Sequence, residues 1–191
     1  MKKELIEIET LKQLERMNKE NKVRPSLMTP KHYDGSMIVT NSFVAIKVDD
    51  EKYKDDNRND YPTNAVQLFT GDAVEWIELA LNDMKALKEV SGTFKRLKEK
   101  TITITFEKDN FIIKGYNSKI ETTLPYQQVK YSGDIINKAI NMDPKYVEQI
   151  LAYYIKLKAT IVKLDYMGEH YPIKVTSGPV QYLAAQIRNP R

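Results

Sequence analysis

The pattern of apolar and polar positions predicts three helices, of which the last is the best defined. Apolar residues spaced at i, i+3, i+4 and i+7 share one helix face, and here they are Val147, Ile150, Leu151 and Tyr154. The Asp-Pro pair at residues 143–144 suits the start of this helix, because aspartate caps N–H groups and proline needs no donor in the first turn. We therefore expect a helix that buries one face and leaves the other to solvent.

Two further helices are expected nearer the N-terminus. Thr10 and Gln13 match a capping box, which opens a helix over residues 10–21. The short apolar run at residues 5–8, just before it, predicts a strand. Apolar residues at helical spacing predict the other helix over residues 73–90.

Short extended runs separated by turn residues accompany each helix. Threonine and isoleucine alternate over residues 101–106, which indicates a strand with one wet face. The other expected strands cover residues 37–40, 43–48, 65–69, 111–115, 119–124, 160–165, 171–176 and 181–188. The order strand, helix, antiparallel meander thus appears three times, at about residues 3–48, 65–125 and 135–188, and predicts an α+β fold.

A charged segment divides the chain. Residues 49–64 lack apolar periodicity, so we expect a long exposed loop or an internal linker. The preferred division is one unit with this loop, residues 1–64, followed by a pair of units, residues 65–191. A division into residues 1–126 and 127–191 remains open.

The residues needed for most enzymatic chemistry are missing. The chain has no cysteine, and its two histidines, His32 and His170, lie far apart without the spacing of metal ligands. Glycine-rich nucleotide motifs and nucleophile motifs are absent, and the polar segment lacks the glycine and glutamate of a calcium loop. We expect no enzymatic activity, no cofactor and no metal site.

The net charge and the hydropathy of the chain limit the kinds of partner that it can bind. The 191-residue chain has 30 Lys and Arg against 26 Asp and Glu, a net charge of only +4, so any DNA binding depends on where the cations lie. No apolar run approaches the length of a membrane span, so we expect a cytoplasmic protein without a membrane partner.

Several stretches resemble the bacterial β sliding clamp. Asp-Pro-Lys-Tyr opens the last helix, Tyr-Pro-Ile-Lys-Val at residues 171–175 forms the next-to-last strand, and residues 182–188 come close to the end, in the order found in that family. Arg-Pro at residues 24–25 follows the first helix, as in the opening of a clamp domain. The chain departs from the family at Gln186, where clamps have proline, and in its odd number of units.

The resemblance implies a DNA-clamp-like fold, with antiparallel sheets on one side and helices on the other. It also implies a DNA polymerase processivity factor whose helices face duplex DNA without reading its sequence, while outer strands bind a peptide of DNA polymerase or another replication protein. The alternative is a clamp-fold adaptor that binds replication proteins and never encircles DNA. A solvated lysine face is likewise an alternative interpretation of the basic helices.

The residues implied for these roles fall into two sets. The DNA-contacting set comprises Lys12, Arg16, Lys19, Lys22, Arg24, Lys85, Lys88, Lys145 and Lys156, and a dense basic run nearby includes Lys95 and Arg96. The peptide-binding set comprises Tyr182, Leu183, Ala185 and Ile187.

The odd number of units implies a homo-oligomer. Edge strands of neighbouring clamp subunits pair around a ring, and an unpaired edge recruits a partner. Twelve units in a ring would require four copies of a three-unit chain, with a two-fold dimer as the fallback. The alternative is that residues 49–64, or the tail at residues 189–191, fold over the edge and cap it.

Overall fold

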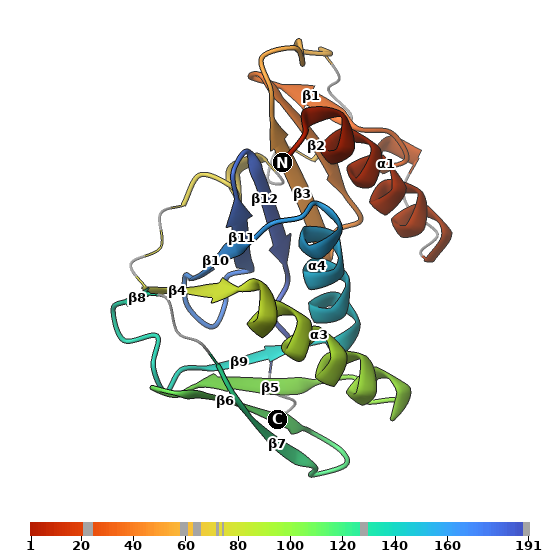
Figure 1. Ribbon diagram of the computed structural model, residues 1–191. Helices are drawn as coiled ribbons and strands as arrows, with labels where there is room; N and C mark the ends of the chain where they lie inside the picture. The colour runs from red at the N-terminus through yellow and green to blue at the C-terminus, as the bar shows by residue number, and fades with distance from the viewer. Residues whose placement is uncertain are drawn as a thin grey trace.

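The computed structural model describes residues 1–20, 25–57, 61–62, 66–71, 73, 75–126 and 130–188. Its long helices line one side of two antiparallel sheets, as Figure 1 shows. They are α1 (Lys3–Glu20), α3 (Leu81–Arg96) and α4 (Pro144–Lys156), and the short 3-10 helix η1 covers Pro25–Leu27. The expected α+β architecture is confirmed.

The two sheets differ in size. The larger has eight strands in the order β1-β2-β3-β12-β11-β10-β4-β8, and the smaller has four in the order β7-β6-β5-β9. The strands of the larger sheet are β1 (Lys31–Tyr33), β2 (Ser36–Thr40), β3 (Val44–Asp49), β4 (Glu75–Ala80), β8 (Tyr131–Ser132), β10 (Ile161–Tyr166), β11 (Ile173–Ser177) and β12 (Val180–Ala184). Those of the smaller sheet are β5 (Ile102–Phe106), β6 (Asn110–Gly115), β7 (Glu121–Pro125) and β9 (Ala139–Met142).

Two units of the fold complete one another by exchanging strands. In each of these units the first strand runs into a helix, β4 into α3 and β9 into α4, and three further strands follow. However, β4 pairs with β10 of the other unit, and β9 pairs with β5. Since α3 and α4 also pack against each other, these two units form one body.

The N-terminal unit consists of α1 and strands β1 to β3, without a leading strand of its own. It joins the rest through β3, which pairs with β12 so that Ile46 lies opposite Tyr182. On the helix side the Thr10 and Tyr153 hydroxyls are hydrogen-bonded at 2.7 Å, which links α1 to α4. The first and last parts of the chain therefore meet both within the large sheet and on its helix side.

The start of α4 is as predicted from its capping residues. The Asp143 carboxylate accepts a hydrogen bond from the Lys145 N–H at 2.8 Å, and Pro144 occupies the first turn. Val147, Ile150 and Leu151 are buried in the main core. The predicted phase of this helix is confirmed.

The predicted start of the first helix is wrong. Residues 5–8 are not a strand, because α1 already begins at Lys3. Thr10 does not cap the helix; its hydroxyl donates to the Ile6 carbonyl at 2.7 Å from within the helix. Three polar residues, Glu9, Thr10 and Gln13, are buried on the core side of α1, so the apolar pattern understates the buried face.

Two predictions in the middle of the chain are also corrected. The helix expected over residues 73–90 begins only at Leu81, after strand β4, where the Asp83 carboxylate accepts the Ala80 N–H at 3.1 Å. Burial of Ile77 and Leu79 shows the period of two typical of a strand. Residues 66–69 form a turn, with the Phe69 N–H bonded to the Val66 carbonyl, and not the expected strand.

The segment after β3 folds back over the outer edge of β1. The Asp56 carboxylate accepts the His32 N–H at 2.8 Å, and the Asp56 N–H donates to the His32 carbonyl at 3.3 Å. The Asp55 carboxylate accepts the Asp34 N–H at 2.7 Å. We call Asp55 and Asp56 the edge cap, because they occupy backbone groups that an added strand would use.

A buried ion pair fixes the edge cap to the sheet. The Lys31 side chain is 10% exposed and donates to an Asp56 carboxylate oxygen at 2.5 Å. Tyr53 and Tyr61 of the same segment are buried as well. The part of residues 49–64 that the structure describes is therefore not wholly exposed, and it closes one end of the large sheet.

Candidate peptide groove and basic helix face

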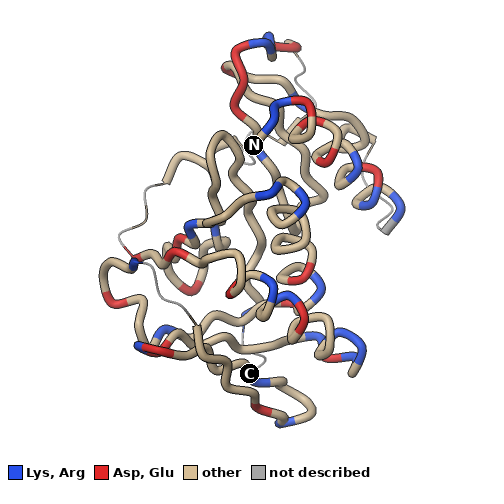
Figure 2. Tube along the Cα trace, in the orientation of Figure 1, with Lys and Arg blue, Asp and Glu red and all other residues tan. Residues whose placement is uncertain are grey.

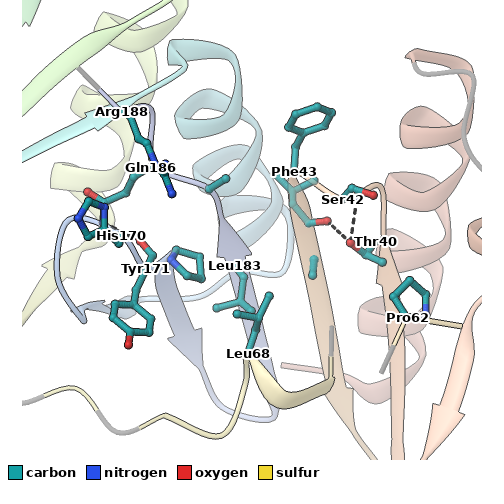
Figure 3. Close-up of a pocket in the computed structure, with 14 residues that line it drawn as sticks. Thr40, Ser42, Phe43, Pro62, Leu68, His170, Tyr171, Leu183, Gln186 and Arg188 are labelled. Atoms are coloured by element: carbon teal, nitrogen blue, oxygen red, sulfur yellow. Dashed lines mark hydrogen bonds between the residues drawn. The ribbon is translucent and has the colours of Figure 1, made fainter. Parts of the chain in front are cut away.

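A groove of about 360 Å³ lies where the first unit meets the last, on the sheet face turned away from the helices (Figure 3). Side chains alternate across a strand, so Tyr182 packs on the helix side while Leu183 faces the groove. The apolar lining includes Phe43, Ala45, Leu68, Leu183 and Ala185, and His170, Gln186 and Arg188 add polar groups.

A tight turn before β3 pushes Phe43 outward. The Asn41 side-chain oxygen accepts the N–H groups of Phe43 and Val44, both at 3.0 Å. The Thr40 hydroxyl donates to the Val44 carbonyl at 2.7 Å, and Ser42 takes a positive φ of 76°. As a result Phe43 is 53% exposed and stacks on Tyr146 at 6.4 Å.

Gln186 holds the opposite wall of the groove. Its side-chain amide donates to the carbonyls of Gly168 and Tyr171, both at 2.7 Å. These bonds fix the turn that carries His170 and Tyr171 into the lining (Figure 3). Gln186 thus shapes the groove.

The four residues of the predicted peptide-binding set do not share one location. Leu183 and Ala185 line the groove. Tyr182 is fully buried on the helix side, where its ring centroid lies 5.7 Å from that of Tyr153. Ile187 lies outside the groove lining, and its N–H is bonded to the Asn141 carbonyl. Phe43 and Tyr171 were missed. The pairing of β3 with β12 brings Phe43 to the C-terminal strand, and the Gln186 hydrogen bond holds Tyr171 there.

The second candidate surface is the helix side, where Lys and Arg recur along α1, α3 and α4 with acidic residues between them (Figure 2). Of the predicted DNA-contacting set, Lys22 and Arg24 lie outside the described residues. Several of the cations are paired within the face: Lys12 contacts Glu9 at 2.7 Å, and Lys88 contacts Glu89 at 2.5 Å. The face is therefore mixed in charge.

Three members of that set meet in one place. Arg16 of α1 and Lys145 and Lys156 of α4 line a notch of about 480 Å³ together with Lys95 of α3. We call these four residues the basic notch. Lys12, Lys19, Lys85 and Lys88 do not line it.

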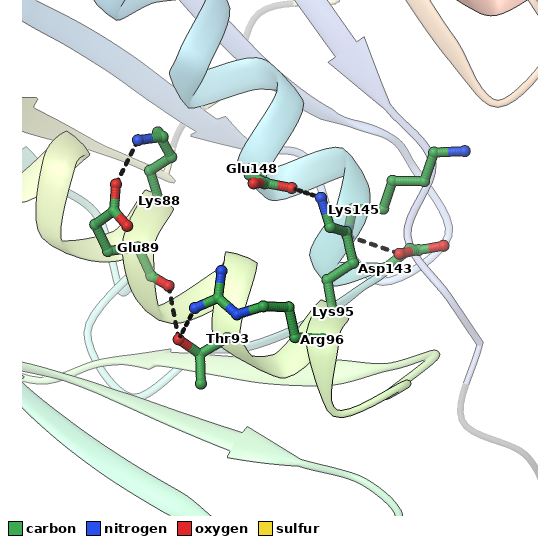
Figure 4. Close-up of polar contacts among 8 residues, drawn as sticks. All are labelled: Lys88, Glu89, Thr93, Lys95, Arg96, Asp143, Lys145 and Glu148. Carbon is green, nitrogen blue, oxygen red and sulfur yellow. Dashed lines mark hydrogen bonds and ion pairs between the residues drawn. The ribbon is translucent and has the colours of Figure 1, made fainter.

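Two carboxylates lie against the basic notch. Glu148 pairs with Lys95 across α3 and α4 (Figure 4), and Glu9 lies 3.7 Å from the Lys156 ammonium. The hydrogen bond from Lys12 lowers the pKa of Glu9 despite the opposing effect of burial, so this carboxylate stays ionised at neutral pH. Among the residues that the structure describes, four cations thus lie beside two anions.

In the described ranges, no three acidic or histidine side chains gather into a possible metal site. None of the described helices is long and apolar enough to span a membrane.

Neither a protein-family model nor a curated protein sequence matches the chain. Solved structures do. The Helicobacter pylori β clamp in complex with diflunisal superposes with a TM-score of 0.70 at 13% identity, covering 95% of this chain and 64% of that one. The Bacillus subtilis DNA polymerase sliding clamp gives 0.69 at 12% identity, covering 89% and 59%.

A further structure, the Helicobacter pylori β clamp bound to a DNA ligase peptide, gives a TM-score of 0.54 at 18% identity and covers 82% of this chain and 41% of that one. The chain thus spans less than two thirds of each of these proteins. The chain has the fold of the bacterial DNA sliding clamps, as the resemblance implied.

Proposed function

We propose that the chain is a sliding-clamp-like tethering factor, which holds DNA polymerase or another replication protein on duplex DNA without reading sequence. One observation carries this proposal: the groove and the basic notch lie on opposite faces of one sheet, both at the junction of the first and last units. One face is thus available for a peptide while the other meets phosphates.

The arrangement of edges supports a two-fold dimer within this proposal. The edge cap occupies the outer edge of β1, whereas β7 pairs with β6 on one side and ends the smaller sheet. β7 is the last strand of its unit, as β3 and β12 are the last strands of theirs. Since β3 pairs with β12, the edge of β7 is equivalent to an edge that is paired elsewhere in the chain. We propose that a second copy adds at β7, and that residues 1–64 act as a lone unit beside the pair at residues 65–191.

The alternative function is a clamp-fold adaptor that binds a replication protein and does not contact DNA. The carboxylates among the helix cations and the net charge of only +4 favour it. DNA binding distinguishes the two functions, because the adaptor needs the groove alone.

We expect weak, sequence-independent and salt-sensitive binding to duplex DNA. Lysine and arginine on helix faces neutralise phosphates without reaching base edges, so the logarithm of affinity should fall with the logarithm of salt by about 0.9 per phosphate contact. Fluorescence anisotropy with two unrelated duplexes over a salt series measures this. A preference for one sequence that persists at high salt would contradict the proposal, and no binding at low salt would select the adaptor.

The groove should bind an apolar peptide through Phe43. Phe43→Ala removes an exposed aromatic anchor and is expected to weaken binding of a peptide from the partner polymerase roughly tenfold. Calorimetry against Tyr116→Ala provides the control, since Tyr116 is also exposed but lies outside the groove. Equal affinities of the two variants would show that the peptide binds elsewhere.

A further inference from the structure

The basic notch differs from an ordinary lysine face in how it is assembled. Its cations come from three helices, with Arg16 on α1, Lys95 on α3, and Lys145 and Lys156 on α4. The i, i+4 spacing of one helix does not bring them together; the packing of α1 and α3 around α4 does. The fold therefore fixes the backbone positions of these cations before any ligand binds, which lowers the cost of forming an anion site.

The Glu148 side chain lies among these cations and close to α3. Its carboxylate pairs with Lys95, and a Cβ atom at Gly92 would lie only 3.2 Å from a Glu148 carboxylate oxygen. The lack of a side chain at residue 92 therefore leaves room for this carboxylate between the two helices. Figure 4 shows the pair bridging α3 and α4, beside the Arg96 side chain that bonds to Thr93.

The pair is also easy to exchange. The Lys95 side chain is 44% exposed and that of Glu148 is 25% exposed, and ion pairs in such positions contribute only about 0–1 kcal/mol. A phosphodiester oxygen accepts a hydrogen bond from a lysine ammonium, as a carboxylate oxygen does. An incoming phosphate can therefore replace Glu148 on Lys95 at little cost, while Arg16 and Lys145 line the same notch.

We propose that the basic notch binds one phosphodiester group of duplex DNA, and that Glu148 is a built-in competing anion that takes the place of this phosphate on Lys95. This inference rests on the proposed function and assigns it a specific contact. The competition weakens each bound state, so the phosphate leaves readily and the chain moves to the next one. Glu148 thus favours movement along DNA over tight binding.

Glu148→Gln tests the competition directly. The amide keeps the size of the side chain and removes its charge, so duplex affinity at low salt should rise about fivefold, with a steeper salt dependence. The matched control is Glu89→Gln, which removes the same charge from a lysine-paired glutamate on α3 outside the notch. We expect this control to change affinity by less than twofold, and melting curves verify that both variants are folded.

The cations provide the converse test. Arg16→Gln and Lys145→Gln should each weaken duplex binding about fivefold, against less than twofold for Lys114→Gln, whose side chain pairs with Glu121 on the smaller sheet. Equal effects of Glu148→Gln and Glu89→Gln, in a chain that binds duplex DNA, would overturn the notch and leave the tethering function intact. If neither the wild type nor Glu148→Gln binds duplex DNA, the proposed function itself fails.

Discussion

Ile150→Asp is expected to unfold the body formed by the two strand-exchanged units. Ile150 is 3% exposed on α4, and it packs in an apolar region to which both units contribute, including Ile104 and Leu164. A carboxylate at this position has no partner, and burial of an unpaired charge costs several kcal/mol. Since small domains are stable by only about 5–15 kcal/mol, most of the folded population should be lost at physiological temperature.

Thermal melting followed by circular dichroism measures this loss. Gln149→Asp is the control, because it places the same charge one residue earlier on a side of α4 that is only partly buried. That variant should melt within a few degrees of the wild type. If Ile150→Asp also melts like the wild type, α4 does not pack through the face described above.

Asp56→Ala is expected both to destabilise the chain and to change its association. The substitution removes the carboxylate that accepts from the Lys31 ammonium, and loss of a hydrogen bond to a charged group costs about 1.5–3 kcal/mol. It also frees the His32 N–H on the outer edge of β1. Exposed edges recruit strands, so species larger than the wild-type assembly should appear.

Sedimentation at micromolar concentration, read against the chain mass of 22.2 kDa, detects the added association, and a melting curve gives the stability. Glu89→Ala serves as the control, since it breaks a surface pair with Lys88 on α3, away from any strand edge, and should change the free energy of unfolding only slightly. An Asp56→Ala variant with wild-type mass and melting temperature would show that something other than the edge cap closes this edge.

The sequence predicted α4 because each local signal agreed with its burial. Asp143 caps it, Pro144 starts it, and its buried residues are nearly all apolar. The phase of α1 was obscured since Glu9, Thr10 and Gln13 take core positions, where Thr10 is hydrogen-bonded to Tyr153 of another helix. No propensity argument reveals such contacts, because the partners lie far away in the chain.

The boundary between β4 and α3 was missed for a different reason. Ile77 and Ala80 of the strand happen to continue the helical spacing of Leu81 and Met84, so one apolar period appears to run through both elements. The strand is specified by its pairing with β10, with Ile77 opposite Leu164. Leu164 lies about ninety residues further along the chain, so the local apolar pattern does not reveal this pairing.

The candidate sites follow the same rule. Leu183 and Ala185 were found through the family resemblance, whereas Phe43 lines the groove only because β3 and β12 are neighbours, and Tyr171 because Gln186 holds its turn. Lys95 was visible in a basic run, yet its position beside Arg16 and Lys145 depends on how three helices pack. The sequence showed which residue types are present, but it did not show which of them the fold brings together.

The pairing of β3 with β12 has a consequence for synthesis of the chain on the ribosome. β3 leaves the ribosome early and can pair with β2, but its second partner is β12, Val180–Ala184, and β4 likewise waits for β10. Until then Val44 and Ile46 sit on an open, apolar strand edge, which is where nascent chains misassociate. Closure of the large sheet therefore waits until β10 and β12 have been made, and chaperone binding to the nascent chain should concentrate on β3 and β4.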